Sequence, residues 1–206
     1  MKEVIQHFYR FNKPVVEKSL KNCHTVGLYS IVLDDKDGRL MRLFLADISH
    51  DLYLNQSLSA SMSVGFHSHS RDLTLVRLQG KVYNVEAFAY PPNCGLSMTH
   101  KCNRFLYESK IKGNEGGFTK AGRVDLTVSL PKLFDTLHLK AKDLHTIYME
   151  QYEKAAWLVL EGEEDKTYEA FTYSNRPLNN LKFDSSLYMP MSYEEVGHVL
   201  EYFKLL

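Results

Sequence analysis

The sequence predicts an all-β protein that has one well-signalled helix, at the C-terminus. Aromatic and β-branched residues are plentiful, and short apolar runs alternate with turns that contain Gly, Asn, Asp or Pro. Many short strands at intervals of about eight to twelve residues are typical of an antiparallel sandwich or a jelly-roll barrel. The 206 residues suffice for one domain with its own core. We therefore expect a single β-barrel domain over residues 1–206.

Three pairs of neighbouring strands are expected, and each pair has a short connection: 25–35 with 39–47, 73–79 with 81–90, and 144–150 with 155–162. The first connection, "DDKDG", and the second, at Gln79-Gly80, carry typical turn residues. The third connection is the polar "QYEK". Residues 61–69, 102–111, 122–130 and 133–141 are each expected to form a further strand.

A C-terminal helix over about 192–205 is predicted by its cap and its apolar face. Ser192 and, three residues later, Glu195 form a capping box, which marks the start of a helix. An apolar stripe at helical spacing follows, made of Val196, Val199, Leu200 and Phe203. This stripe should lie against a sheet. Residues 1–20 are expected to contain either a second short helix or an edge strand, and the sequence does not decide between them.

The composition narrows the classes of function. The 25 basic and 25 acidic side chains cancel, so no overall positive field favours nucleic acid as a partner. No apolar run reaches the roughly 20 residues of a membrane helix. The first residues also lack the apolar core of a signal peptide. We expect a cytoplasmic protein without membrane contact.

The three cysteines, Cys23, Cys94 and Cys102, show no framework spacing, which fits reduced thiols. Cys94, His100 and Cys102 could supply three zinc ligands if a fourth came from elsewhere in the fold. Structural zinc sites usually pair their cysteines as C-x-x-C, so free thiols on a loop are the preferred interpretation.

The stretch "GFHSHS" places His67 and His69 one residue apart on a predicted strand. Side chains of a strand alternate between its faces, so both imidazoles point the same way and can reach one metal ion. A third ligand would have to come from another strand. A solvent-facing pair, or a core pair satisfied by hydrogen bonds, is the alternative.

Together with the residues that follow them, the two histidines match a motif that is found in a protein family. "HSHSRDLTLVRLQG" has two histidines, an apolar strand and Gly80 at the offsets of the first cupin motif, and so resembles the cupin superfamily. "KAKDLHTIYMEQYEKAAWLVLEG" resembles the second cupin motif and has His145 in the ligand position. The Pro-x-Gly that often precedes this histidine is replaced by residues 140–142, "KAK".

One departure from the motif changes the expected ligands. The common cupin motif carries a Glu ligand where this chain has Thr74, whose hydroxyl is a poor metal ligand. The resemblance then implies the ligands His67, His69 and His145. This set is similar to that of cysteine dioxygenase and its thiol dioxygenase relatives, which bind ferrous iron. Their Ser-His-Tyr relay is absent, because residues 156–160 read "AWLVL". Cysteine is therefore not the expected substrate.

Five residues are candidates for binding a substrate: Arg42, Thr74, Tyr83, Tyr148 and Trp157. Arg42 lies on an early strand, where the thiol dioxygenases place an arginine that grips a carboxylate, but it could equally be a solvated strand residue. The aromatic residues could line the barrel or belong to its core. Asp72 could orient a ligand histidine or serve only as a turn residue.

The resemblance implies a cupin-type double-stranded β-helix, a jelly-roll barrel with extra strands and the C-terminal helix. Its core would span about 25–172, with an insertion at about 91–120. Cupins commonly pair through sheet edges, so a homodimer is also expected.

These patterns predict a mononuclear metal-binding cupin. Its three histidines would hold Fe²⁺, or another divalent metal such as Zn, Ni or Mn. The expected reaction is a dioxygenase-like oxidation of a small molecule bound in the barrel. Whether the chain is an enzyme stays open, and two alternatives remain.

One alternative is a non-catalytic cupin that binds a small, nucleotide-like ligand. This would fit a similarity to small cupin-like proteins of tailed phages, and it would place the protein in the cytoplasm of a phage host. The other is a metal-dependent hydrolase or isomerase on the same barrel.

Overall fold

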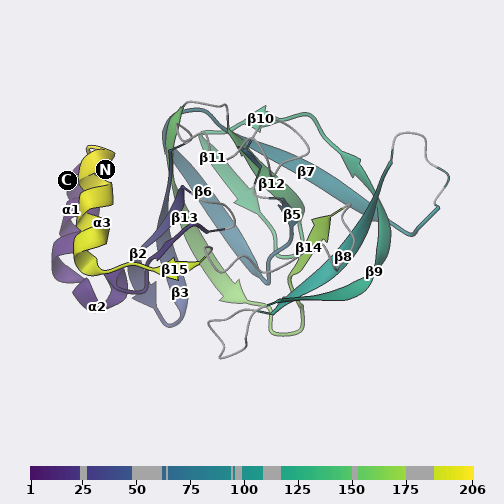
Figure 1. The fold of residues 1–206 in the computed structure, drawn as a ribbon, viewed down its shortest axis with the longest axis horizontal. Coiled ribbons are helices and arrows are strands. Elements are labelled where there is room, and N and C mark those ends of the chain that lie inside the picture. The colour runs from purple at the N-terminus through teal and green to yellow at the C-terminus, as the bar shows by residue number, and fades with distance from the viewer. Residues whose placement is uncertain are drawn as a thin grey trace.

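The computed structural model describes residues 1–23, 27–47, 62–63, 65–93, 95, 99–108, 117–149, 153–174 and 188–206. Within these ranges the chain forms strands β1 to β15 and helices α1 to α3 (Figure 1). Most of the described residues lie in strands, and the helices are short. The predicted all-β fold is confirmed.

One of the two sheets, sheet A, has the strand order β11-β6-β13-β3-β2-β1-β15. Its strands are β1 (Leu20–Lys21), β2 (Leu28–Lys36), β3 (Arg39–Asp47), β6 (Arg71–Gln79), β11 (Thr136–Leu139), β13 (Lys154–Glu164) and β15 (Met189–Pro190). All of these pairings are antiparallel. Residues 155–159 of β13 are buried, because β6 and β3 pair with the two edges of this strand and other layers cover its faces.

The other sheet, sheet B, closes on itself. Its strands are β4 (Met62–Ser63), β5 (Phe66–His67), β7 (Val82–Tyr90), β8 (His100–Glu108), β9 (Gly117–Val128), β10 (Lys132–Leu133), β12 (Leu144–Met149) and β14 (Phe171–Ser174). The pairings β7–β9, β9–β8, β8–β14, β14–β5, β5–β12 and β12–β7 form a ring. We call this ring the closed barrel.

The molecule is layered, with the helices on one side of sheet A and sheet B on the other (Figure 1). The helices are α1 (Lys2–Phe11), α2 (Lys13–Val16) and α3 (Tyr193–Tyr202). Ser192 caps α3 and forms the predicted capping box with Glu195. Val196 and Leu200 are fully buried in a cluster with Leu43 and Leu45 of β3. The predicted C-terminal helix and its contact with a sheet are therefore confirmed.

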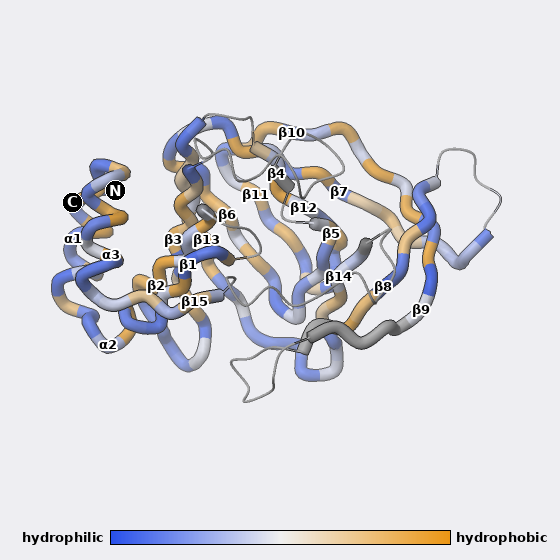
Figure 2. The backbone as a smooth tube through the Cα atoms, in the orientation of Figure 1, coloured by the Kyte–Doolittle hydropathy of each residue, from blue (hydrophilic) through white to orange (hydrophobic). Residues whose placement is uncertain are grey.

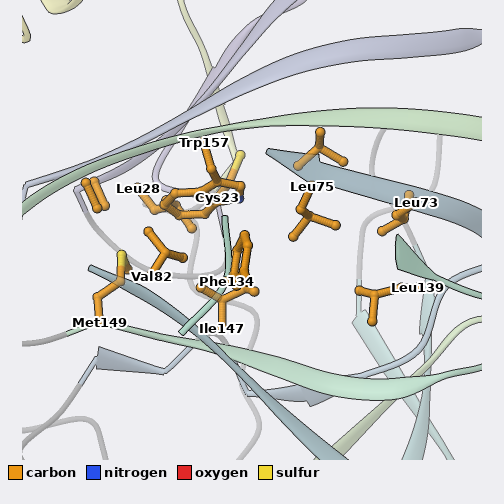
Figure 3. Close-up of a cluster of buried hydrophobic side chains, with 13 residues drawn as sticks. Cys23, Leu28, Leu73, Leu75, Val82, Phe134, Leu139, Ile147, Met149 and Trp157 are labelled. Atoms are coloured by element: carbon orange, nitrogen blue, oxygen red, sulfur yellow. The ribbon is translucent and has the colours of Figure 1, made fainter. Parts of the chain in front are cut away.

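The main core lies between sheet A and sheet B (Figure 3). Leu73, Leu75 and Trp157 point into it from sheet A. Ile147 and Met149 meet them from β12. In Figure 2 hydrophobic residues recur along the strands of both sheets, while turns are largely hydrophilic. Because apolar side chains cover both faces of β12, this strand is buried on its two sides.

Two of the three predicted strand pairs are wrong. The first hairpin is correct, since β2 and β3 pair with each other. The second and third are not hairpins: β6 and β13 belong to sheet A, whereas β7 and β12 belong to sheet B. Each short connection passes from one sheet to the other, which is a jelly-roll connection. The strand expected at 61–69 is present only as β4 and β5, and Val64 lies outside the described residues.

The region expected to be an insertion, about 91–120, contains β8 and the start of β9. These two strands pair with each other along their length and form one side of the closed barrel. Within residues 1–20, for which a helix and an edge strand were both open, the chain forms α1 and α2, and the short strand β1 begins at Leu20. None of the described helices is long and apolar enough to span a membrane.

Gly80 occupies the corner between β6 and β7, with φ at +73°. A Cβ at this position would overlap the carbonyl oxygen of Lys154 and press on Ala155 of β13. We predict that Gly80→Ala lowers the free energy of unfolding by more than about 2 kcal/mol, because positive φ costs about 1–2 kcal/mol and the overlap adds to it. Urea denaturation measures the loss.

Gly38→Ala is the matched control, since Gly38 has φ at +77° and open space around it. Its loss should stay at about 1–2 kcal/mol, the cost of the backbone conformation alone. Equal losses in the two variants would contradict the proposed overlap with β13.

Candidate metal centre

The structure brings together the three histidines that the sequence singled out. His67 lies on β5, His69 follows in the loop before β6, and His145 lies on β12. One ring nitrogen of each lies within 4.8 Å of the other two. His67 and His145 are direct cross-strand partners, with ring centroids 4.9 Å apart. We call these residues the histidine triad.

The triad faces the space between the two sheets. On β12, His145 alternates with Leu144 and Thr146 and points to the same side as Ile147 and Met149, which are part of the main core. His145 is buried, with 2 % of its surface exposed, whereas His67 and His69 are half-buried. The triad is therefore set at the edge of the apolar core and reaches solvent on one side.

Hydrogen bonds determine which nitrogen of two rings carries a proton. Asn84 Oδ1 accepts a hydrogen bond from His145 Nδ1 at 2.8 Å, and the Gly65 carbonyl accepts one from His67 Nδ1 at 2.9 Å. In the neutral form of each ring, Nε2 then carries the lone pair that a metal requires. His69 Nε2 lies 3.0 Å from His145 Nε2. The Nε2 atoms of His69 and His145 therefore converge on each other.

The backbone around His67 and His69 is held from two directions. Ser68 is buried, and its Oγ accepts a hydrogen bond from the Phe171 amide and contacts the Tyr168 hydroxyl at 2.8 Å. The carbonyl of His69 accepts a hydrogen bond from the Lys142 amide at 3.0 Å. These bonds anchor the segment both to the chain that precedes β12 and to the chain that leads into β14.

Sequence reasoning missed Asn84, Glu86, Ser68 and Tyr168. Asn84 is 2 % exposed and lies on β7, next to His145. Glu86 is the cross-strand partner of His145 and pairs with Lys132 at 3.6 Å. A buried Asn in an apolar strand is a sequence signal that could have been noticed. Ser68 and Tyr168 are brought together only by the fold.

The surroundings favour neutral imidazole at His67. Desolvation lowers the pKa of His67 below its usual value, and the hydrogen bond to Gly65 opposes that shift only in part. A neutral ring is the form that binds metal. The position of His67 between two sheets therefore prepares it as a ligand at neutral pH.

Three of the five candidate substrate residues point away from the triad. On β6, Thr74 lies between the core residues Leu73 and Leu75, faces the opposite side, and contacts His138 Nδ1 at 3.0 Å. Tyr83 and Tyr148 are cross-strand partners whose ring centroids lie 5.5 Å apart. They alternate with Asn84 and His145 respectively, so they lie on the other side of the β7–β12 wall.

Arg42 and Trp157 do point between the sheets. Trp157 is 2 % exposed, stacks on Phe44 with centroids 5.5 Å apart, and is part of the main core (Figure 3). Arg42 Nε donates to Glu161 Oε1 at 2.7 Å, and another guanidinium nitrogen donates to Ser30 Oγ at 3.2 Å. Arg42 is thus neither solvated nor unpaired. A substrate carboxylate would compete with Glu161 for it.

The sequence also suggested roles for Asp72 and for the cluster of Cys94, His100 and Cys102. Asp72 accepts hydrogen bonds from the Ala141 amide and from Lys140 Nζ, so it fastens the connection before β12 to β6 rather than any triad ring. Cys102 is a free, half-buried thiol, and His100 is exposed. Cys94 lies outside the described residues, so the alternative zinc cluster stays a prediction.

Comparisons with known proteins concern the fold. No family model and no curated protein matches the chain. A cupin superfamily protein from Desulfitobacterium hafniense is a solved structure similar to it, with 14 % identity, a TM-score of 0.33, and coverage of 70 % of this chain and 98 % of that one.

Two similar structures are enzymes by description. Hydroxypropylphosphonic acid epoxidase from S. wedmorenis has 11 % identity and a TM-score of 0.34, with 69 % of this chain and 53 % of that chain covered. Hydroquinone 1,2-dioxygenase from Sphingomonas has 12 % identity and a TM-score of 0.30, with 66 % and 65 % covered. The present chain thus spans only part of these two proteins.

Proposed function

We propose that the chain is a mononuclear metal-binding cupin in which Nε2 of His67, His69 and His145 holds a divalent metal, Fe²⁺ in the first place. The observation that carries the proposal is the convergence of three imidazole nitrogens within 4.8 Å. Imidazole suits iron, zinc, copper and nickel. A cluster drawn from a strand, a loop and a second strand is also the arrangement expected of a built site rather than of chance neighbours.

The residues present fit such an ion. His69 and His145 Nε2 lie 3.0 Å apart, so both could reach one ion, which would displace any proton between them. The acceptors on His145 and His67, Asn84 Oδ1 and the Gly65 carbonyl, are the partners that usually orient ligand histidines.

The reaction we propose is dioxygenase-like oxidation of a small molecule. A three-histidine metal centre supplies open positions at which a substrate and dioxygen can be brought together. The chain would contribute the apolar wall of Leu73 and Leu75, which limits water around the triad. Glu86, next to His145 and half-buried, is placed to accept or return a proton.

The metal site can be tested without a substrate. We predict that tag-free protein contains near-stoichiometric iron after anaerobic loading, and that His67→Ala, His69→Ala and His145→Ala each abolish it. His138→Ala is the control, because His138 is exposed on β11 and contacts Thr74 instead. Elemental analysis measures the metal, and an oxygen electrode then screens for turnover. Wild-type protein that stays without metal would reject the proposal.

Stability of the metal-free protein should depend on His67 in the acid range. Because the folded state lowers the pKa of His67, the unfolded chain binds more protons below about pH 6.5. The stabilisation is therefore present above that pH and is lost as pH falls toward the lowered pKa. Urea titrations from pH 8 to about pH 5 should show a smaller loss for His67→Gln than for wild type.

His100→Gln, which removes an exposed histidine, controls for the loss of an imidazole as such. Identical pH profiles for wild type and His67→Gln would contradict the desolvated position of His67.

Asn84 should matter for metal affinity, because it orients His145 without touching the ion. We predict that Asn84→Leu weakens binding of Zn²⁺ about 10- to 100-fold. Asn84→Asp keeps the acceptor for His145 Nδ1 and should retain most of the affinity. Calorimetric titration measures both, with circular dichroism as the check on folding. Unchanged affinity in Asn84→Leu would show that the Asn84–His145 hydrogen bond does not prepare the ligand.

A further inference from the structure

The closed barrel has an interior of its own, separate from the space that holds the triad. A small apolar cluster occupies it, made of Ala87, Leu126 and Leu144 with Phe66, Cys102, Val124 and Tyr173 packed against them. These residues come from all six strands of the ring. None of them belongs to the main core between the sheets. The closed barrel therefore forms a second compartment.

Polar side chains project into this compartment from neighbouring strands, at positions that the strand register aligns. Arg104 on β8 is the cross-strand partner of Tyr173 on β14, and Tyr173 is the partner of Phe66 on β5. Cross-strand partners point to the same face of a sheet, so Arg104 shares the inner face with Tyr173 and Phe66. On β12, Thr146 alternates with His145 and lies on the face of Leu144.

Within the part of the chain that the structure describes, two buried polar atoms inside the barrel lack a hydrogen-bond partner. Among the described residues, the buried side-chain nitrogen and oxygen atoms without a hydrogen bond are Arg104 Nε and Thr146 Oγ1. Thr146 is 4 % exposed. Both atoms belong to the same compartment, although they come from strands on different sides of it.

Arg104 also has no carboxylate partner among the described residues. Its guanidinium lies 4.5 Å from the centre of the Phe171 ring and interacts with the Tyr173 hydroxyl. In the described part of the chain, no carboxylate pairs with it. A half-buried guanidinium usually has an anionic partner, because burying an unpaired cation is costly. The planar N–H groups of arginine suit carboxylate and phosphate oxygens.

We infer that the closed barrel contains a second ligand site, which binds the oxyanion group of a small molecule through Arg104, with Tyr173 and Thr146 as further hydrogen-bond donors. The shared chemistry is that of a carboxylate or a phosphate. Burial raises the pKa of Tyr173, so its hydroxyl stays protonated and able to donate at neutral pH. The apolar residues around it would cover the rest of the ligand.

This site is independent of the proposed metal centre. His67 and His145 project from one face of the β5–β12 pair, whereas Phe66 and Thr146 project from the other. The two compartments therefore share a wall but no side chain. The anion site can be present whether or not the triad binds a metal, and its test uses metal-free protein.

The test is a titration of metal-free full-length protein with sodium phosphate and, separately, sodium acetate, at constant ionic strength set with chloride. Calorimetry measures affinity, and the Arg104 Nε–H signal in NMR reports contact at the proposed atom. We expect saturable binding of at least one anion with a shift of that signal, and the tighter anion identifies the ligand class. Arg104→Gln should weaken binding at least about tenfold, since it removes charge-assisted hydrogen bonds.

Controls separate the site from general charge effects. Arg123→Gln removes an exposed arginine from the neighbouring strand β9 and should leave the affinity unchanged. Thr146→Val should weaken binding less than Arg104→Gln does. His69→Ala should bind the anion as wild type does. No saturable binding in wild type, no movement of the Arg104 signal, or equal losses in Arg104→Gln and Arg123→Gln would overturn the inference.

Discussion

The antiparallel pairing of β5 with β12 is the constraint on which the candidate site depends. It places His67 directly opposite His145, so two ligand candidates that are distant in sequence share one face of one sheet. His69 then needs only the short loop before β6 to reach the same point. Because β5 is only two residues long, its position relies on two hydrogen bonds: the Phe171 amide donates to Ser68 Oγ, and the Lys142 amide donates to the His69 carbonyl.

Within this pair, β12 forms a wall that is buried on both faces. Buried polar groups in such a wall require partners. On the side of sheet A, Asn84, His145 and His69 form a hydrogen-bonded chain that ends where a metal would bind. On the side of the closed barrel, Thr146 Oγ1 and Arg104 Nε lack partners among the described residues. The two sites therefore differ in hydrogen bonding: in the described residues, these polar groups on the side of sheet A have partners, whereas these two atoms on the side of the closed barrel do not.

Local patterns predicted much of the fold. The β2–β3 hairpin and the cap of α3 depend on neighbouring residues, and both were correct. The other two pairs failed because an apolar strand that is buried on both faces carries no mark of the sheet it joins. Gly80 was taken for a hairpin turn, but its positive φ serves a corner between two sheets. Thr74, Tyr83 and Tyr148 were chosen by motif or residue type, which does not specify the face on which a side chain lies relative to a distant strand.

The sequence by itself determined the all-β character and the C-terminal helix, because each follows from spacing along a few residues. It selected His67 and His69 as a pair by expecting both on one strand, whereas His69 lies in the loop after β5. It also identified His145 through a resemblance. Only the tertiary structure decided that His145 faces His67, that Asn84 orients it, and that Arg104 and Thr146 share a separate compartment. These relations join residues far apart in the chain, and they exist only once long-range strand pairing has set which faces meet.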